Sequence, residues 1–86
     1  RKSDLIIALE NSDSFANTHS VISELREIER WEKEEAEMLF SIAVNNSQVF
    51  YILCDSDLKI FFSKLLKDTK STSSNAQKVK EAIDKK

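Results

Sequence analysis

The sequence predicts an all-α fold, a compact bundle of five or six short helices, and three observations lead to this class. The chain contains no glycine and no proline, although the tight turns of antiparallel sheets favour both residues. Asparagine, aspartate and serine separate the apolar segments, and these residues cap helix N-termini. Apolar side chains recur at helical spacing along most of the chain.

Two helices are expected in the first third of the chain. The first has a cap at Ser3 or Asp4. Its apolar face consists of Leu5, Ile6 and Leu9. The polar segment 11–14 interrupts the pattern and supplies caps for a second helix, which is expected to begin at Phe15.

Residues 15–44 could form one helix or two, because their apolar stripe continues almost in phase. We expect a break within residues 30–33, since helices of roughly 8 to 20 residues are typical. A helix that begins near Glu32 would place Glu35 at the capping-box position. Trp31, just before it, would then pack back as a hydrophobic staple.

Residues 49–53, Val-Phe-Tyr-Ile-Leu, are the most ambiguous segment. Their β propensity is high, and alone they are typical of a buried strand. No second β-rich segment exists to pair with them, and unpaired backbone groups in a core are costly. We therefore expect a helix of about two turns over residues 47–54, buried on most sides. An intermolecular strand is the alternative that stays open.

The C-terminal part predicts two further helices. The first is capped by residues 55–57 and has apolar side chains at i, i+3, i+4, i+7 and i+8. These are Leu58, Phe61, Phe62, Leu65 and Leu66. Residues 68–75 are polar and of low complexity, so a mobile loop is expected there. The last helix has a thin apolar stripe of Ala76, Val79 and Ile83, and is expected to be marginal by itself.

Together these segments predict a single helical domain over residues 1–86. At 86 residues, 41% of them apolar, the chain is near the lower size limit for a cooperative core. The expected core is Phe15, Ile22, Leu25, Leu39, Phe40, Val49, Ile52, Leu53, Leu58, Phe61, Phe62 and Leu65. The chain begins with Arg1 rather than methionine, which favours a piece of a longer protein.

A few residues of the chain are of types that occur in catalytic and metal sites. Cys54 and His19 could form a nucleophile and base, with Asn45 or Asp55 orienting the imidazole. The favoured alternative is that Cys54 is an inert core residue, because no nearby cation would lower its pKa. Asp55 and Asp57 could reach one hard cation, although carboxylates at the start of a helix are more often caps.

The chain is therefore not expected to be an enzyme or to carry a cofactor or metal. With no glycine, a glycine-rich phosphate loop is excluded. One cysteine and one histidine cannot form a zinc cage, and a single cysteine cannot form an intrachain disulfide. No apolar run reaches the ~20 residues that span a bilayer, and no segment resembles a signal peptide. We expect a cytoplasmic location and no membrane contact.

The charges are unevenly distributed along the chain. Residues 24–37 carry seven glutamates against three basic residues, whereas residues 59–86 carry eight lysines against three acidic ones. Two solvated helix faces would explain this pattern. A dipolar surface could instead steer a charged partner or support head-to-tail association of identical chains.

The favoured function is a non-catalytic protein-interaction or regulatory module of a larger cytosolic protein, binding a protein partner or a neighbouring domain. Trp31 and Ile60 lie off the apolar stripes of their helices, and Tyr51 is of similar interest. The candidate interface residues are Trp31, Glu34, Ile60, Lys64 and Lys67.

The alternative is an accessory domain of a nucleic-acid-acting or toxin-defence system. Its phosphate contacts would come from Lys59, Lys64, Lys67, Lys78 and Lys80. This reading is weaker because the region lacks arginine, and Phe61 and Phe62 are expected to face the core rather than stack on bases.

Overall fold

Six helices follow one another in the part of the chain that the computed structural model describes. This part comprises residues 2–51, 53 and 56–84, with only the backbone described at 56 and 57. The helices are α1 (Lys2–Glu10), α2 (Phe15–Leu25), α3 (Lys33–Asn45), α4 (Ser47–Tyr51), α5 (Ser56–Thr69) and α6 (Ser74–Asp84). These residues contain no strand, and the predicted all-α class is confirmed.

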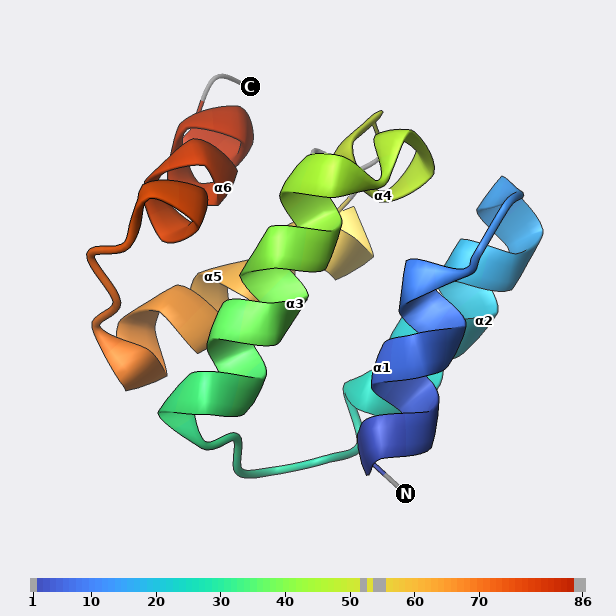
Figure 1. Ribbon diagram of the computed structural model, residues 1–86, viewed down its shortest axis with the longest axis horizontal. Helices are drawn as coiled ribbons and strands as arrows, with labels where there is room; N and C mark the ends of the chain where they lie inside the picture. Colours follow the sequence, from blue (N-terminus) through green and yellow to red (C-terminus); the bar gives the residue numbers. More distant parts are fainter. Residues whose placement is uncertain (1, 52, 54–55, 85–86) are drawn as a thin grey trace.

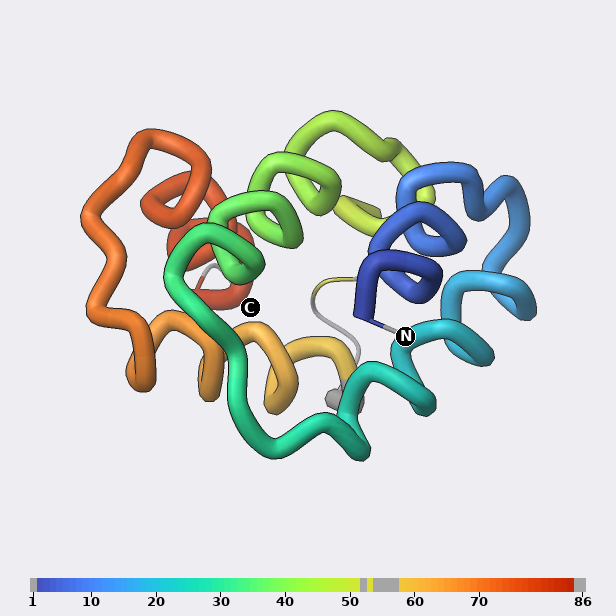
Figure 2. Tube along the Cα trace, turned by 60° about the horizontal axis from the view of Figure 1, so that its bottom comes forward, coloured from blue at the N-terminus to red at the C-terminus, as the bar shows by residue number. Residues whose placement is uncertain are grey.

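Helix α3 lies at the centre of the bundle, between the α1–α2 pair on one side and α6 on the other (Figure 1). It contacts α1, α4, α5 and α6. Helices α5 and α6 also contact each other, and Figure 2 shows α6, in red, above α5, in orange and gold. The bundle measures 27 × 26 × 20 Å, so every helix has one face near the centre.

The core confirms most of the positions expected from the sequence. Buried as expected are Ile22, Leu25, Leu39, Phe40, Val49, Leu53, Leu58, Phe61, Phe62 and Leu65. The prediction is wrong at Phe15, whose side chain is 47% exposed. Phe15 is the first residue of α2, and its ring stacks on the exposed ring of Tyr51, 5.6 Å away between centroids. Ile52 lies outside the described residues.

Two helix starts follow their predicted caps. Helix α2 begins after Ser14, whose hydroxyl oxygen accepts a hydrogen bond from the backbone N–H of Asn17 at 3.2 Å. Helix α3 begins after Glu32, whose own N–H donates to Glu35 Oε1 at 2.9 Å. The capping box and the two-helix reading are thus confirmed, although the break is longer than residues 30–33 because α2 already ends at Leu25.

The Val-Phe-Tyr segment is helical, as expected, but α4 covers only Ser47–Tyr51 rather than two turns. It is also less buried than expected. Val49 is fully buried, whereas Phe50 is 42% and Tyr51 73% exposed. An isolated turn has one face toward the core, so only one of these three side chains can be covered. An extended conformation is excluded for residues 47–51.

The side chain of Asn46 joins the ends of two helices. Its Oδ1 accepts hydrogen bonds from the backbone N–H groups of Gln48 at 2.9 Å and Val49 at 3.3 Å, which caps α4. Its Nδ2 lies 3.4 Å from the carbonyl oxygen of Leu9 and 3.3 Å from that of Glu10, at the C-terminal end of α1. Asn46 therefore supplies an acceptor to the N–H groups at the start of α4 and a donor to the carbonyl groups at the end of α1.

The connection between α5 and α6 is shorter than the loop expected over residues 68–75. Helix α5 continues to Thr69, and α6 begins at Ser74, which leaves four connecting residues, 70–73. Lys70 adopts the left-handed conformation with φ of 52°, a position that glycine would fill without steric cost. A glycine-free sequence can therefore still make this turn.

Glu37 of α3 holds this connection. The hydroxyl of Ser71 donates to Glu37 Oε2, and that of Ser73 donates to Oε1 at 2.7 Å. Ser73 Oγ in turn accepts from the backbone N–H of Ala76 at 3.1 Å and so caps α6. These hydrogen bonds, Ser71 first and Ser73 next, hold the pKa of Glu37 below its ordinary value.

This carboxylate gives the first testable prediction. Glu37→Gln is expected to lower the free energy of unfolding near pH 7 by about 1 kcal/mol, because hydrogen bonds to a charged acceptor are weakened and the site is partly solvated. The lowered folded-state pKa means that charged Glu37 stabilises the fold above about pH 4.5, and that this contribution disappears as the pH falls below that value.

Urea denaturation of the wild type and of Glu37→Gln at about one pH unit spacing between about pH 3 and pH 7 checks the prediction. The difference in the free energy of unfolding between the two proteins should decrease as the pH falls. Glu34→Gln is the control, because Glu34 is exposed on the same helix. A Glu37→Gln penalty that is constant with pH would contradict the assignment.

No helix among the described residues is both long and apolar enough to cross a membrane.

Candidate functional site

An apolar groove lies between α5 and the segment that joins α2 to α3, which runs beside α5 in Figure 2. Its volume is about 190 Å³. The lining residues are Arg26, Ile28, Trp31, Ile60, Phe61, Lys64, Leu65 and Asp68. We call this feature the Trp31 groove. Its walls are mostly aliphatic and aromatic. The ionic side chains that line it are Arg26, which follows α2, and Lys64 and Asp68 of α5.

Trp31 enters the groove because the chain between α2 and α3 is not helical there. The indole packs edge-to-face on Phe61, with 6.3 Å between centroids and 79° between ring planes. The ring is half-buried and packs against the core, where it covers part of α5. Its Nε1 is buried and has no hydrogen-bond partner among the described residues. Buried donors are nearly always paired, so this N–H is unusual.

Lys2 of α1 also contacts the tryptophan ring. Its Nζ lies 5.2 Å from the centroid of the indole ring and 3.0 Å from Glu35 Oε1. The same carboxylate accepts from the backbone N–H of Glu32, and this bond, followed by Lys2, holds the pKa of Glu35 below its ordinary value. Trp31 is therefore positioned by the start of α3 and by the first turn of α1 together.

The groove brings together three of the five residues expected at an interface. Trp31, Ile60 and Lys64 all line it. Ile60 is 59% exposed although it is a large aliphatic side chain, and Lys64 is exposed beside it. In the sequence, Trp31 and Ile60 are conspicuous because they lie off the apolar stripes of their helices. In the structure, both side chains line the same groove.

The other two candidates lie elsewhere. Lys67 lines a separate hollow between α5 and α6, together with Lys80, Ser71 and Asp84. Glu34 is exposed on α3 and does not line the groove. The three charged candidates, Lys64, Lys67 and Glu34, therefore lie at different places on the surface.

A second apolar hollow, between α4 and α6, was not expected as a unit. Phe50, Tyr51 and Leu53 line it with Val44 and Ala82, and Lys78 and Glu81 stand at its edge. Tyr51 was of interest from the sequence, but it lies here and not with Trp31. Because the pair Phe15–Tyr51 is stacked between α2 and α4, no linear spacing rule could have found it.

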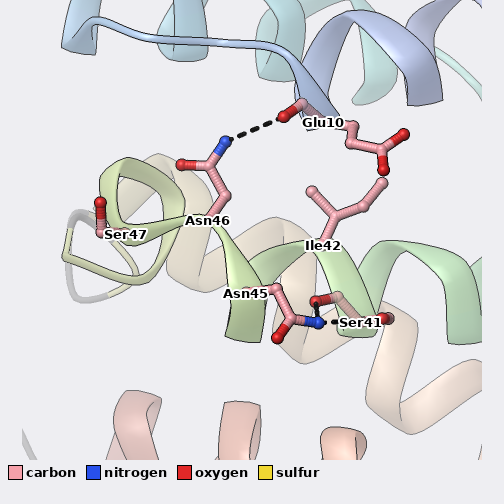
Figure 3. Close-up of a pocket in the computed structure, with 6 residues that line it drawn as sticks. All are labelled: Glu10, Ser41, Ile42, Asn45, Asn46 and Ser47. Atoms are coloured by element: carbon pink, nitrogen blue, oxygen red, sulfur yellow. Dashed lines mark hydrogen bonds between the residues drawn. The ribbon is translucent and has the colours of Figure 1, made fainter.

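A polar hollow lies where α1 approaches the end of α3 (Figure 3). It is lined by Glu10, Ser41, Ile42, Asn45, Asn46 and Ser47 and has a volume of about 420 Å³. Its amides are already engaged. Asn45 Nδ2 donates to the carbonyl oxygen of Ser41 at 2.9 Å, and Asn46 Nδ2 donates to that of Glu10. The amide groups of this hollow therefore hold the helices together through hydrogen bonds within the protein.

The catalytic and metal hypotheses fall mostly on residues that are not described. Cys54 and Asp55 lie outside the described residues, as does the side chain of Asp57. His19 is half-buried on α2. Within residues 2–51, 53 and 56–84, histidines and acidic side chains form no group of three that could hold a metal ion.

Comparison with known proteins adds no relative, since no protein-family model, curated protein or solved structure matches this chain.

Proposed function

We propose that this chain is a non-catalytic protein-interaction or regulatory module of a larger cytosolic protein, and that the Trp31 groove contacts a protein partner or a neighbouring domain. The observation that supports this most is the convergence of Trp31, Ile60 and Lys64 on one apolar hollow. Trp is enriched among the residues that dominate binding energy at protein interfaces. An exposed isoleucine beside it supplies apolar area that remains uncovered in the isolated domain.

The electrostatics support a non-catalytic role. Perturbed pKa values often mark catalytic groups. Among the described residues, the carboxyls with a lowered pKa are Glu35 and Glu37, and both hold helices in place through the hydrogen bonds described above. Neither of them lines the Trp31 groove.

A protein partner is favoured over nucleic acid because acidic side chains accompany the lysines. Lys64 shares its groove with Asp68, and Lys78 shares its hollow with Glu81. Lys67 and Lys80 line a hollow that also contains Asp84. Phosphate binding depends on uninterrupted positive charge, which these pairs reduce.

A selection of displayed peptides against the purified chain tests the proposal. Peptides that bind are expected to lose roughly tenfold in affinity with Ile60→Ser, since covering an isoleucine contributes about 1 to 2 kcal/mol. Ile7→Ser is the matched control, because Ile7 is 54% exposed and lies on α1 outside the groove. Both substitutions remove exposed apolar area, so circular dichroism should show that both variants stay folded.

Two results would count against the groove. One is a set of selected peptides that bind Ile60→Ser as well as the wild type, and the other is a loss of affinity caused by Ile7→Ser instead. A selection that enriches no peptide above background would also contradict an interaction module.

A further inference from the structure

Helix α6 rests on the rest of the bundle along a narrow strip. It lies at one edge of the body in Figure 1 and contacts α3 and α5. The buried side chains of α6 are Ala76, Val79 and Ile83, and the first of these carries only a methyl group. All other buried apolar side chains among the described residues come from residues 5–65. Most of the core is therefore supplied by the part of the chain that precedes α6.

Hollows border the buried strip of α6 on both sides. The hollow between α4 and α6 has a volume of about 440 Å³ and is lined by Lys78 and Ala82 of α6. The hollow between α5 and α6 has a volume of about 330 Å³ and is lined by Lys80 and Asp84. At 3.6 residues per turn, these two pairs of positions lie on opposite sides of the buried strip. Along both hollows, the sides of α6 face open space rather than packed side chains.

The start of α6 is held to α3 by polar contacts. The two carboxylate oxygens of Glu37 accept hydrogen bonds from the hydroxyl groups of Ser71 and Ser73. Both serines belong to the four-residue connection 70–73, so these bonds fix the point at which α6 joins the rest of the chain. We call Glu37 together with Ser71 and Ser73 the Glu37 latch.

From these observations we infer that α6 is a lid, which opens as one unit about residues 70–73 while α1–α5 stay folded, and that the Glu37 latch holds it closed. Segments with few buried apolar contacts open at a lower free energy than the whole domain. Opening uncovers Val44 of α3 and Leu66 of α5, which are partly buried and line the two hollows. The lid is independent of the proposed function, since α6 does not line the Trp31 groove.

Native-state hydrogen exchange of the wild type, followed by NMR at low denaturant concentrations, tests the lid. The N–H groups bonded within α6 are expected to exchange roughly tenfold faster than those at the centre of α3 and to share one free energy of opening. Their exchange should depend only weakly on denaturant, because opening of one helix exposes little surface. Exchange that becomes steadily faster toward Asp84 would show fraying from the end and would overturn the lid. So would exchange in α6 with the free energy and denaturant dependence of α3.

A substitution in α2 separates opening of the lid from unfolding of the whole domain. Ile22 is buried in α2, and its burial is lost only when the domain unfolds. Ile22→Val is therefore expected to speed exchange at the centre of α3 by roughly fivefold. Exchange in α6 should change by less than about twofold, because Ile22 stays buried when only the lid opens. Equal acceleration in both helices would contradict the inference.

Ser73→Asp tests the latch and keeps the cap of α6. Its carboxylate can still accept from the backbone N–H of Ala76, but it cannot donate to Glu37 and repels that carboxylate. Exchange in α6 is expected to be roughly tenfold faster in this variant. Ser74→Asp is the matched control, because Ser74 is exposed on the first turn of α6, and it should change exchange by less than about twofold.

A double variant identifies Glu37 as the partner of Ser73. In Glu37→Gln combined with Ser73→Asp, the glutamine amide can donate to the aspartate, so exchange in α6 should return toward the wild-type rate. Equal effects of Ser73→Asp and Ser74→Asp would overturn the latch. Exchange in the double variant as fast as in Ser73→Asp alone would also overturn it.

Discussion

Asn46→Ala is expected to lower the free energy of unfolding by about 2 to 3 kcal/mol, a large part of the roughly 5 kcal/mol that a domain of this size has. The alanine removes the cap of α4, where Oδ1 accepts from Gln48 and Val49. It also removes the donor that meets the carbonyl oxygens of Leu9 and Glu10. Urea denaturation followed by circular dichroism measures the loss, and the slope of the transition should stay unchanged.

Two further substitutions separate the contributions of the two ends. Asn46→Asp keeps an acceptor for α4 but turns a negative oxygen toward the carbonyls of α1, so it should cost at least as much as alanine near pH 7. Asn45→Ala is the matched control, because Asn45 Nδ2 donates only within α3, to Ser41 at 2.9 Å. The control is expected to change stability by about 0.5 kcal/mol or less. Equal losses for Asn45→Ala and Asn46→Ala would refute the joining role of Asn46.

Phe40→Ala is expected to cost about 3 to 5 kcal/mol and to leave the domain largely unfolded. Phe40 is fully buried on the central helix α3, and its ring lies 6.4 Å from that of Phe62 between centroids. Truncation would leave a cavity bordered by α5, and the elements around α3 cannot all move to fill it.

Phe15→Ala provides the comparison, because the sequence placed Phe15 in the same core. In the structure its side chain is 47% exposed, so truncation should cost about 1 kcal/mol or less. Thermal unfolding by circular dichroism can rank both variants against the wild type. A Phe15→Ala loss as large as that of Phe40→Ala would show that the ring is covered in solution.

Local chemistry was the part of this fold that could be predicted from the sequence. Caps and apolar stripes act within a few residues, and they identified the start of α2 after the polar segment 11–14, the start of α3 after Glu32, and the buried face of α5. The lack of a β-rich partner segment also correctly predicted that residues 47–51 are helical. Each of these features depends on hydrogen bonds or spacing inside one segment.

Features that depend on two distant segments could not be predicted. Phe15 is exposed at the first position of α2, where its ring stacks on Tyr51 of α4. The connection before α6 is held by Glu37, more than 30 residues away in sequence. Asn46 donates to the carbonyl oxygens of Leu9 and Glu10 in α1, which are 37 and 36 residues away in sequence. The site was found only in part for the same reason, since Trp31 and Ile60 were each conspicuous but their common groove exists only after folding.

The position of Lys2 has a practical consequence for labelled forms of this protein. Its ammonium group lies over the indole of Trp31 and contacts Glu35, so the first turn of α1 helps to hold Trp31 in place. Figure 1 shows the two chain ends on opposite sides of the body. A fluorophore, affinity tag or fusion partner placed directly before Lys2 would therefore crowd its contact with the indole of Trp31, and the C-terminal end is the better place for it.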